Sequence, residues 1–333
     1  MARRRKQLLE ALVDLDNLHV AFGLASRGKR LHRDTARLFF DLEREMLMLR
    51  HELLEGRYRF GPYRVFTIRD PKERTIKAAP FRDRVVHHAI CNVIEPIFDR
   101  AMIHDSFACR VNKGNLAAVH RLRRWVRGRR QDYALSCDIR RYFDSVDHQI
   151  LLDLLARRIG DDGMLVLLKR LIQGGASELG RGIPIGNLTS QLFANIYLDP
   201  FDHFVKESLR VRHYVRYVDD FVCLGSSKQE LWETAESITQ RLGELKLALS
   251  YSKVRVAPVA TGVPFLGFVV RPGGLRLRGR RLVRSRRLLR QRRLEHERGE
   301  ISEDRYLATL ESLLARLYQC DSGGALARRH GWR

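Results

Sequence analysis

Closely spaced cysteine pairs are missing from this sequence. Its five cysteines are odd in number and form no CxxC motif; they are Cys91, Cys109, Cys137, Cys223 and Cys320. The spacing gives no sign of a zinc site or a redox couple, and it is typical of reduced thiols in an intracellular protein.

Long apolar runs are also missing. No uninterrupted apolar stretch approaches the roughly 18 residues that a membrane-spanning helix needs. The N-terminus is basic like a signal peptide, but Glu10, Asp14 and Asp16 interrupt the segment that would have to be apolar. We therefore expect a soluble cytoplasmic protein with no membrane partner.

Acidic residues are scarce relative to basic ones. The 333 residues include 62 Lys and Arg against 39 Asp and Glu, which gives a formal net charge of +23 and a pI near 10.5. Such a charge favours a polyanionic partner, with nucleic acid ahead of an acidic protein or a membrane surface. Because 44% of the residues are hydrophobic, the chain can still bury a core.

Hydrophobic periodicity predicts a mixture of helices and antiparallel strands. Helices are expected at 34–55, 82–98, 116–126, 188–209 (kinked or divided at Pro200) and 228–246. Strands are expected at 63–68 with 75–79 as a hairpin, at 133–139, at 213–218 with 221–224 as a second hairpin, and at 264–270. The pattern predicts the α+β class.

Two adjacent acids sit where two apolar strands meet, in Tyr217-Val218-Asp219-Asp220. Adjacent carboxylates repel each other unless a cation neutralises them, although an ordinary Asp-Asp turn is an alternative. Asp138 ends the strand at 133–139, so three carboxylates could hold two divalent ions about 3.5–4 Å apart, an arrangement that suits phosphoryl transfer. Asp147 is more simply a helix N-cap and Asp144 a turn residue, so both are left out of this site.

Several motifs occur in an order that resembles a reverse transcriptase with the palm of template-dependent polymerases. They are Phe81 to His88 in the fingers, Asp138 to Phe143, the loop Ile183 to Gln191, the Tyr217 to Asp220 hairpin, Lys253, and Phe265-Leu266-Gly267 as primer grip. The resemblance implies an RNA-directed DNA polymerase with a right-hand architecture. It implies an N-terminal region and fingers at 1–131, a palm at 132–270 with a fingers-linked loop at 174–191, and a short basic helical thumb at 271–333.

The resemblance also implies residue roles. Asp138, Asp219 and Asp220 would be catalytic and hold two Mg²⁺ ions, and Lys253 would protonate the leaving pyrophosphate. Substrate would meet Lys72, Arg74, Phe143 (which would exclude a ribose 2′-hydroxyl), Ile185, Gly186, Gln191 and Tyr217. The alternatives are a surface role for Arg74 and Lys253 and a core role for Phe143 and Ile185.

Ile185-Gly186 and Ser190-Gln191, together with the string Ala78 to His88, resemble the reverse transcriptases of diversity-generating retroelements. That resemblance implies a bacterial or phage-encoded enzyme that uses dNTPs to copy a template-repeat RNA into cDNA mutated mostly at adenines. It also implies a small basic oligomeric accessory protein. Ile185 offers no hydrogen bond to a base pair, so we predict that it lowers fidelity, and Gly186 allows close backbone approach.

Two other functions stay open at this point. One is a stand-alone reverse transcriptase of a phage-defence system, and the other is a non-catalytic RNA-binding protein that kept the palm fold. In each case the arginines at 121–130 and 271–293 would contact phosphates of bound RNA or of a cDNA/RNA duplex, so affinity should fall with salt.

Overall fold

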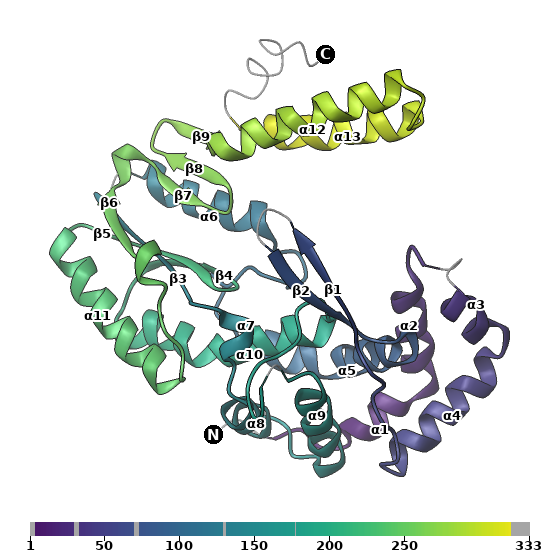
Figure 1. The fold of residues 1–333 in the computed structure, drawn as a ribbon. Coiled ribbons are helices and arrows are strands. Elements are labelled where there is room, and N and C mark those ends of the chain that lie inside the picture. Colours follow the sequence, from purple (N-terminus) through teal and green to yellow (C-terminus); the bar gives the residue numbers. More distant parts are fainter. Residues whose placement is uncertain (1–3, 30–32, 70–72, 129–130, 177, 321–333) are drawn as a thin grey trace. The chain divides into compact units, whose positions relative to one another are not determined.

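The computed structural model describes residues 4–29, 33–69, 73–128, 131–176 and 178–320. Two compact units interleave along the chain (Figure 1). We call Met1–His104, Ile139–Phe204 and Thr239–Ala248 the helical unit. We call Asp105–Asp138, Val205–Ile238 and Leu249–Arg333 the sheet unit.

The helical unit is built around a central buried helix, α5 (Phe81–Asp99), whose Val85, Val86 and Ile90 are fully buried. A two-stranded antiparallel hairpin, β1 (Arg64–Arg69) with β2 (Glu73–Ala78), carries mostly exposed side chains. The other helices are α1 (Leu8–Val13), α2 (Leu15–Ser26), α3 (Arg33–Phe40), α4 (Leu42–Leu54), α7 (Tyr142–Ser145), α8 (His148–Ala156), α9 (Asp162–Gly174) and α10 (Leu188–His203).

Two helix predictions in or next to this unit need correction. The single helix expected at 34–55 is divided into α3 and α4, because Asp41 leaves helical geometry with φ −125° and ψ 40°. Division of the second helix at Pro200 is also wrong. The helix α10 passes through Pro200 to His203 and continues as a π-helix, Phe204–Ser208.

The sheet unit contains a four-stranded antiparallel sheet in the order β4-β5-β3-β6. Its strands are β3 (Tyr133–Asp138), β4 (His213–Tyr217), β5 (Asp220–Gly225) and β6 (Arg255–Pro258). A three-stranded sheet follows, made of β7 (Val263–Phe265), β8 (Phe268–Arg271) and β9 (Gly274–Leu277). The helices are α6 (Asn115–Arg127), α11 (Lys228–Glu244), whose last residues belong to the helical unit, and the neighbouring pair α12 (Gly279–Glu297) and α13 (Glu303–Tyr318).

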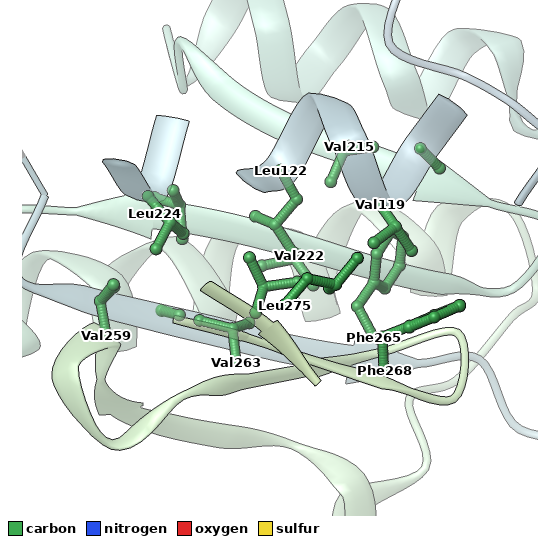
Figure 2. Close-up of a cluster of buried hydrophobic side chains, with 14 of the residues drawn as sticks. Val119, Leu122, Val215, Val222, Leu224, Val259, Val263, Phe265, Phe268 and Leu275 are labelled. Atoms are coloured by element: carbon green, nitrogen blue, oxygen red, sulfur yellow. The ribbon is translucent and has the colours of Figure 1, made fainter. Parts of the chain in front are cut away.

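One hydrophobic cluster joins α6, the four-stranded sheet and the three-stranded sheet. Figure 2 shows Val119 and Leu122 of α6 meeting Val215 and Val222 of the four-stranded sheet and Val263 of the smaller sheet. Each is at most 2% exposed, and fully burying such a side chain contributes roughly 1.5–3 kcal/mol. The cluster thus fixes the strands whose ends carry the acidic residues.

The mixture of helices and antiparallel sheets confirms the predicted α+β class. The single strand expected at 264–270 is wrong, because the chain reverses there. Leu266 (φ 49°) and Gly267 (φ 83°) both adopt the left-handed conformation between β7 and β8, as a tight two-residue hairpin turn requires. Within the residues described, no helix combines the length and apolar character needed to cross a bilayer.

Candidate active site

Strand register brings the predicted acids to one end of the four-stranded sheet. Asp138 is the last residue of β3 and is the direct partner of Asp220, the first residue of β5. Asp220 also pairs with Tyr217 at the end of β4, which leaves Val218 and Asp219 as the turn between the strands. The half-buried Tyr217 packs against the hydrophobic cluster, and burial raises the pKa of its hydroxyl.

The three carboxyl groups interact electrostatically. Burial, followed by the charges of Asp219 and Asp138, raises the pKa of Asp220 to about 7. The ammonium of Lys253 and the backbone N–H of Leu266, which donates to the Asp220 carboxylate, act in the opposite direction. The site therefore concentrates negative charge in a partly dehydrated place, which is the condition under which carboxylates gain most from a cation.

Lys253 lies against Asp138. It ends a short 3₁₀ turn, Tyr251–Lys253, and its Nζ forms an ion pair with Oδ2 of Asp138. The backbone fixes this turn, because the N–H of Ser250 donates to the carbonyl of Asp138 over 2.8 Å. The structure thus brings together the predicted acids and the predicted proton donor.

The donor chemistry fits a divalent metal ion, since carboxylate oxygens are the ligands that Mg²⁺ prefers. Across the described ranges, however, no group of three or more His, Cys, Asp or Glu side chains is arranged to hold a metal ion. At Asp138 the ammonium of Lys253 takes up one carboxylate oxygen. A metal ion held by all three acids would meet Asp138 either at its other carboxylate oxygen or in place of this lysine.

The predicted primer grip lies at the turn between β7 and β8. Phe265 is buried, and the N–H of Leu266 reaches the Asp220 carboxylate as described above. Arg281 of α12 donates from Nη1 to the carbonyl of Leu266 over 2.8 Å, and the N–H of Arg278 donates to the carbonyl of Gly267 over 3.0 Å. The turn is therefore held by the start of α12 on one side and contacts an acid on the other.

The predicted nucleotide loop lies in the helical unit. The carbonyl of Ile185 accepts from the N–H of Lys77 over 3.2 Å, and the Nζ of Lys77 donates to the carbonyls of Gly175 (3.2 Å) and Ala176 (2.8 Å). Gly186 has φ 116°, and a Cβ there would lie 2.9 Å from Cγ2 of Ile76. Lys77 of β2 thus binds the chain at two places, at Gly175-Ala176 and at Ile185, and Ile76 leaves no room for a side chain at position 186.

The remaining predicted substrate residues also belong to the helical unit. Arg74 is exposed on β2 opposite Ile68. Phe143 is half-buried on α7, and its carbonyl accepts from the N–H of Ile183 over 2.9 Å. Gln191 is exposed on α10, and Lys72 lies outside the described residues. The three acids belong to the sheet unit.

Three residues with contacts to these segments were not predicted from the sequence: Lys77, Arg216 and Arg281. Each reaches a backbone carbonyl of a predicted site segment. For Lys77 and Arg281 the partner is distant in the chain. A single sequence carries no periodicity that could indicate such a pairing. For Arg216, an arginine in an otherwise apolar strand was an available signal.

Comparison with known proteins identifies the class. Residues 69–270 match the family described as reverse transcriptase (RNA-dependent DNA polymerase). This match covers more than half of the chain, so the chain belongs to that family and is an RNA-directed DNA polymerase by family. Enzymes of this family generally use divalent metal ions, and they bind RNA templates and dNTPs.

The similar proteins include a group II intron-encoded protein. Protein YkfC of Escherichia coli K12 is 29% identical over 273 residues, which cover 67% of this chain and 70% of YkfC. The group II intron-encoded protein LtrA of Lactococcus lactis subsp. cremoris is 28% identical over 202 residues, 58% of this chain but 33% of LtrA. Among solved structures, a telomerase from Candida albicans in complex with a TWJ fragment of telomeric RNA has a TM-score of 0.48 at 13% identity, covering 67% of this chain and 46% of the other. The α+β fold is consistent with the right-hand polymerase expected from the sequence.

Proposed function

We propose that this chain is the reverse transcriptase of a diversity-generating retroelement, which copies a template-repeat RNA into cDNA mutated mostly at adenines. The observation that carries the polymerase activity is the register of β3 and β5, which pairs Asp138 with Asp220 beside Asp219. The loop sequence Ile185-Gly186 with Ser190-Gln191 supports the subfamily. The proposal includes a cytoplasmic, bacterial or phage-encoded protein.

In this proposal Asp138, Asp219 and Asp220 hold two Mg²⁺ ions. When bound, such ions lower the pKa of the primer 3′-hydroxyl and stabilise charge at the attacked phosphorus. Lys253 carries a proton within reach of the site and donates it to the leaving pyrophosphate. Burial and the neighbouring charges of Asp219 and Asp138 raise the pKa of the Asp220 carboxyl, which supports the role of these acids as cation ligands.

Further roles follow the family pattern. Arg74, with its neighbour Lys72, contacts the base and triphosphate, Phe143 lies under the sugar and excludes ribonucleotides, and Gln191 and Tyr217 line the nucleotide site. Phe265 to Gly267 grip the primer, and the basic helix α12 together with α13 acts as the thumb in the region 271–333. A small basic oligomeric accessory protein joins through the shared RNA, since two basic proteins repel each other.

Primer extension on an RNA template with one dNTP omitted at a time tests the proposal. The wild type should extend, and Asp219→Asn should lose activity by at least about a hundredfold because a neutral amide cannot replace a carboxylate ligand. Asp144→Asn is the matched control, since Asp144 pairs with Arg141 on the surface, and it should extend like the wild type. Equal activity of wild type and Asp219→Asn, or no extension by either, contradicts the polymerase proposal.

The same assay separates the subfamilies. Without dTTP, the enzyme should still extend past a template adenine by inserting a wrong nucleotide. Extension past the other template bases should be weaker when their complementary nucleotide is omitted. Ile185→Gln should reduce that readthrough because a polar group then senses the base pair. Accurate copying at adenine favours the stand-alone phage-defence enzyme instead, and RNA binding without any extension favours the non-catalytic alternative.

A further inference from the structure

Arg216, the last residue but one of β4, is a fully buried arginine, with 0% of its surface exposed. Its neighbours in the strand are Val215 and Tyr217. Burying a guanidinium group is unfavourable unless its N–H groups find acceptors. The oxygen atoms that accept hydrogen bonds from this guanidinium therefore identify the segments that Arg216 connects.

Two of these acceptors come from different segments. Nη2 of Arg216 donates to Oγ of Ser106 over 3.0 Å, and Nη1 donates to the carbonyl of Val218 over 2.9 Å. The backbone of Arg216 is held as well, because its N–H donates to the carbonyl of Asp105 and its carbonyl accepts from the N–H of Phe107, each over 3.0 Å. The segment 105–107 therefore runs beside β4 and supports the guanidinium from outside the hairpin.

That segment is itself firmly anchored. The carboxylate of Asp105, 7% exposed, accepts from Arg121 of α6 over 2.7 Å and from Nζ of Lys206 over 2.8 Å. Hydrogen bonds to charged groups that are partly shielded from water contribute more than neutral ones. Arg216 thus connects a rigid support to the turn between β4 and β5.

The turn needs such a support. Val218 has φ 56°, a left-handed conformation that is unfavourable for a β-branched residue. Strained backbone of this kind persists only where its surroundings determine it. The hydrogen bond from Arg216 holds the carbonyl of this strained residue in place. Because Asp219 is the next residue, the same bond fixes the backbone that leads into the acids.

We propose that Arg216 is a positioning residue, which holds the strained Val218 carbonyl so that Asp219 and Asp220 keep their orientation. The inference rests on the proposed polymerase function. Arg216 touches no substrate in this role, and it acts through the backbone of the turn. A merely structural role would lower stability without changing the chemical step.

A double-mutant cycle in primer extension tests the proposal. Arg216→Met removes the bond to the turn and should lower kcat about 10- to 100-fold, because small misplacements of catalytic groups have effects of this size. The KM for dNTP should stay within about twofold. Val218→Gly removes the conformational strain, and in that background Arg216→Met should lower kcat by less than about threefold.

Arg216→Lys covers the case in which Arg216→Met does not fold. A lysine keeps the charge but cannot present two donors in the fixed fork geometry of arginine, so kcat should fall about fivefold or more at an unchanged unfolding temperature. A wild-type kcat in folded Arg216→Lys, or a loss of kcat from Arg216→Met that is the same with Val218 and with Gly at position 218, contradicts the positioning role. Inactive wild-type protein would instead contradict the proposed function, and Asp219→Asn run in parallel reports on that separately.

Discussion

At the scale of single residues, Gly186 shows why the nucleotide loop has its sequence. Its φ of 116° and the 2.9 Å approach of a Cβ to Ile76 both act against any side chain at this position. Gly186→Ala should lower the free energy of unfolding by about 1–3 kcal/mol. Chemical denaturation measures the change.

Gly243 is the matched control for this substitution. It is exposed within α11, and a Cβ there meets nothing within 4 Å. Gly243→Ala should raise stability by up to about 1 kcal/mol, since alanine favours a helix. If Gly186→Ala lowers the free energy of unfolding no more than Gly243→Ala does, the loop tolerates a side chain and its geometry is not determined by Gly186.

His87 should make the free energy of unfolding depend on pH. Burial, helped by the charges of His88 and Arg84, lowers the pKa of His87 to about 3, below the ordinary value near 6.5. The unfolded chain therefore binds the additional proton between pH 6.5 and 3, and the His87 contribution to stability is complete above pH 6.5 and is lost as the pH falls.

This loss should amount to as much as about 1.4 kcal/mol per pH unit. His87→Leu removes the titrating group, so its unfolding free energy should fall less steeply with acid than that of the wild type. Urea denaturation at several pH values between 4 and 7 measures both slopes. Parallel curves would mean that the pKa of His87 is the same in the folded and the unfolded chain.

At the scale of elements, Arg281 links α12 to the turn between β7 and β8. Its bond to the carbonyl of Leu266 supports a turn in which two successive residues are left-handed. Arg281→Met should lower the free energy of unfolding by about 1.5–3 kcal/mol, as expected for a hydrogen bond to a charged donor. The measurement is denaturant unfolding followed by circular dichroism.

Arg280→Met is the control with the same change of charge, because Arg280 is an exposed neighbour on α12. It should change stability by no more than about 0.5 kcal/mol. If the two variants lose the same stability, the effect comes from charge or helix propensity and the contact with Leu266 contributes nothing.

Sequence reasoning succeeded where a turn or a helix cap was marked by its residues. The hairpin of β4 and β5 was predictable because apolar runs flank Asp219 and Asp220, and the Asp147 cap of α8 is confirmed by its bonds to the N–H groups of Gln149 and Ile150. The hairpin of β7 and β8 was missed because strands of three and four residues are too short to show alternation.

The candidate site shows the same limit. The acids were predictable from their places at strand ends, and reverse transcriptase membership was predictable from the order of the motifs. The supports of the site were not, because Lys77 and Arg281 act on backbone atoms of segments far along the chain. Such contacts follow from tertiary structure and leave no local pattern.

At the scale of the whole molecule, the net charge of +23 predicts salt-dependent binding of nucleic acid. Each phosphate contact contributes about 0.7–0.9 to the slope of log affinity against log salt. Replacing the exposed arginines Arg280, Arg287 and Arg290 of α12 by glutamine should make that slope shallower by about 2–3. Fluorescence anisotropy with an RNA–DNA duplex between 50 and 300 mM salt measures it, and an unchanged slope would remove α12 from the binding surface.

The strand order of the four-stranded sheet also has a consequence for biosynthesis. Strand β3 is made early but pairs on one side with β5 and on the other with β6, which leave the ribosome much later. Non-local pairing of this kind is slow and exposes unpaired edges in the meantime. A nascent chain that stops before Arg255 would therefore carry all three acids but leave one edge of β3 open, and it should be a substrate for chaperones and proteases before it is an enzyme.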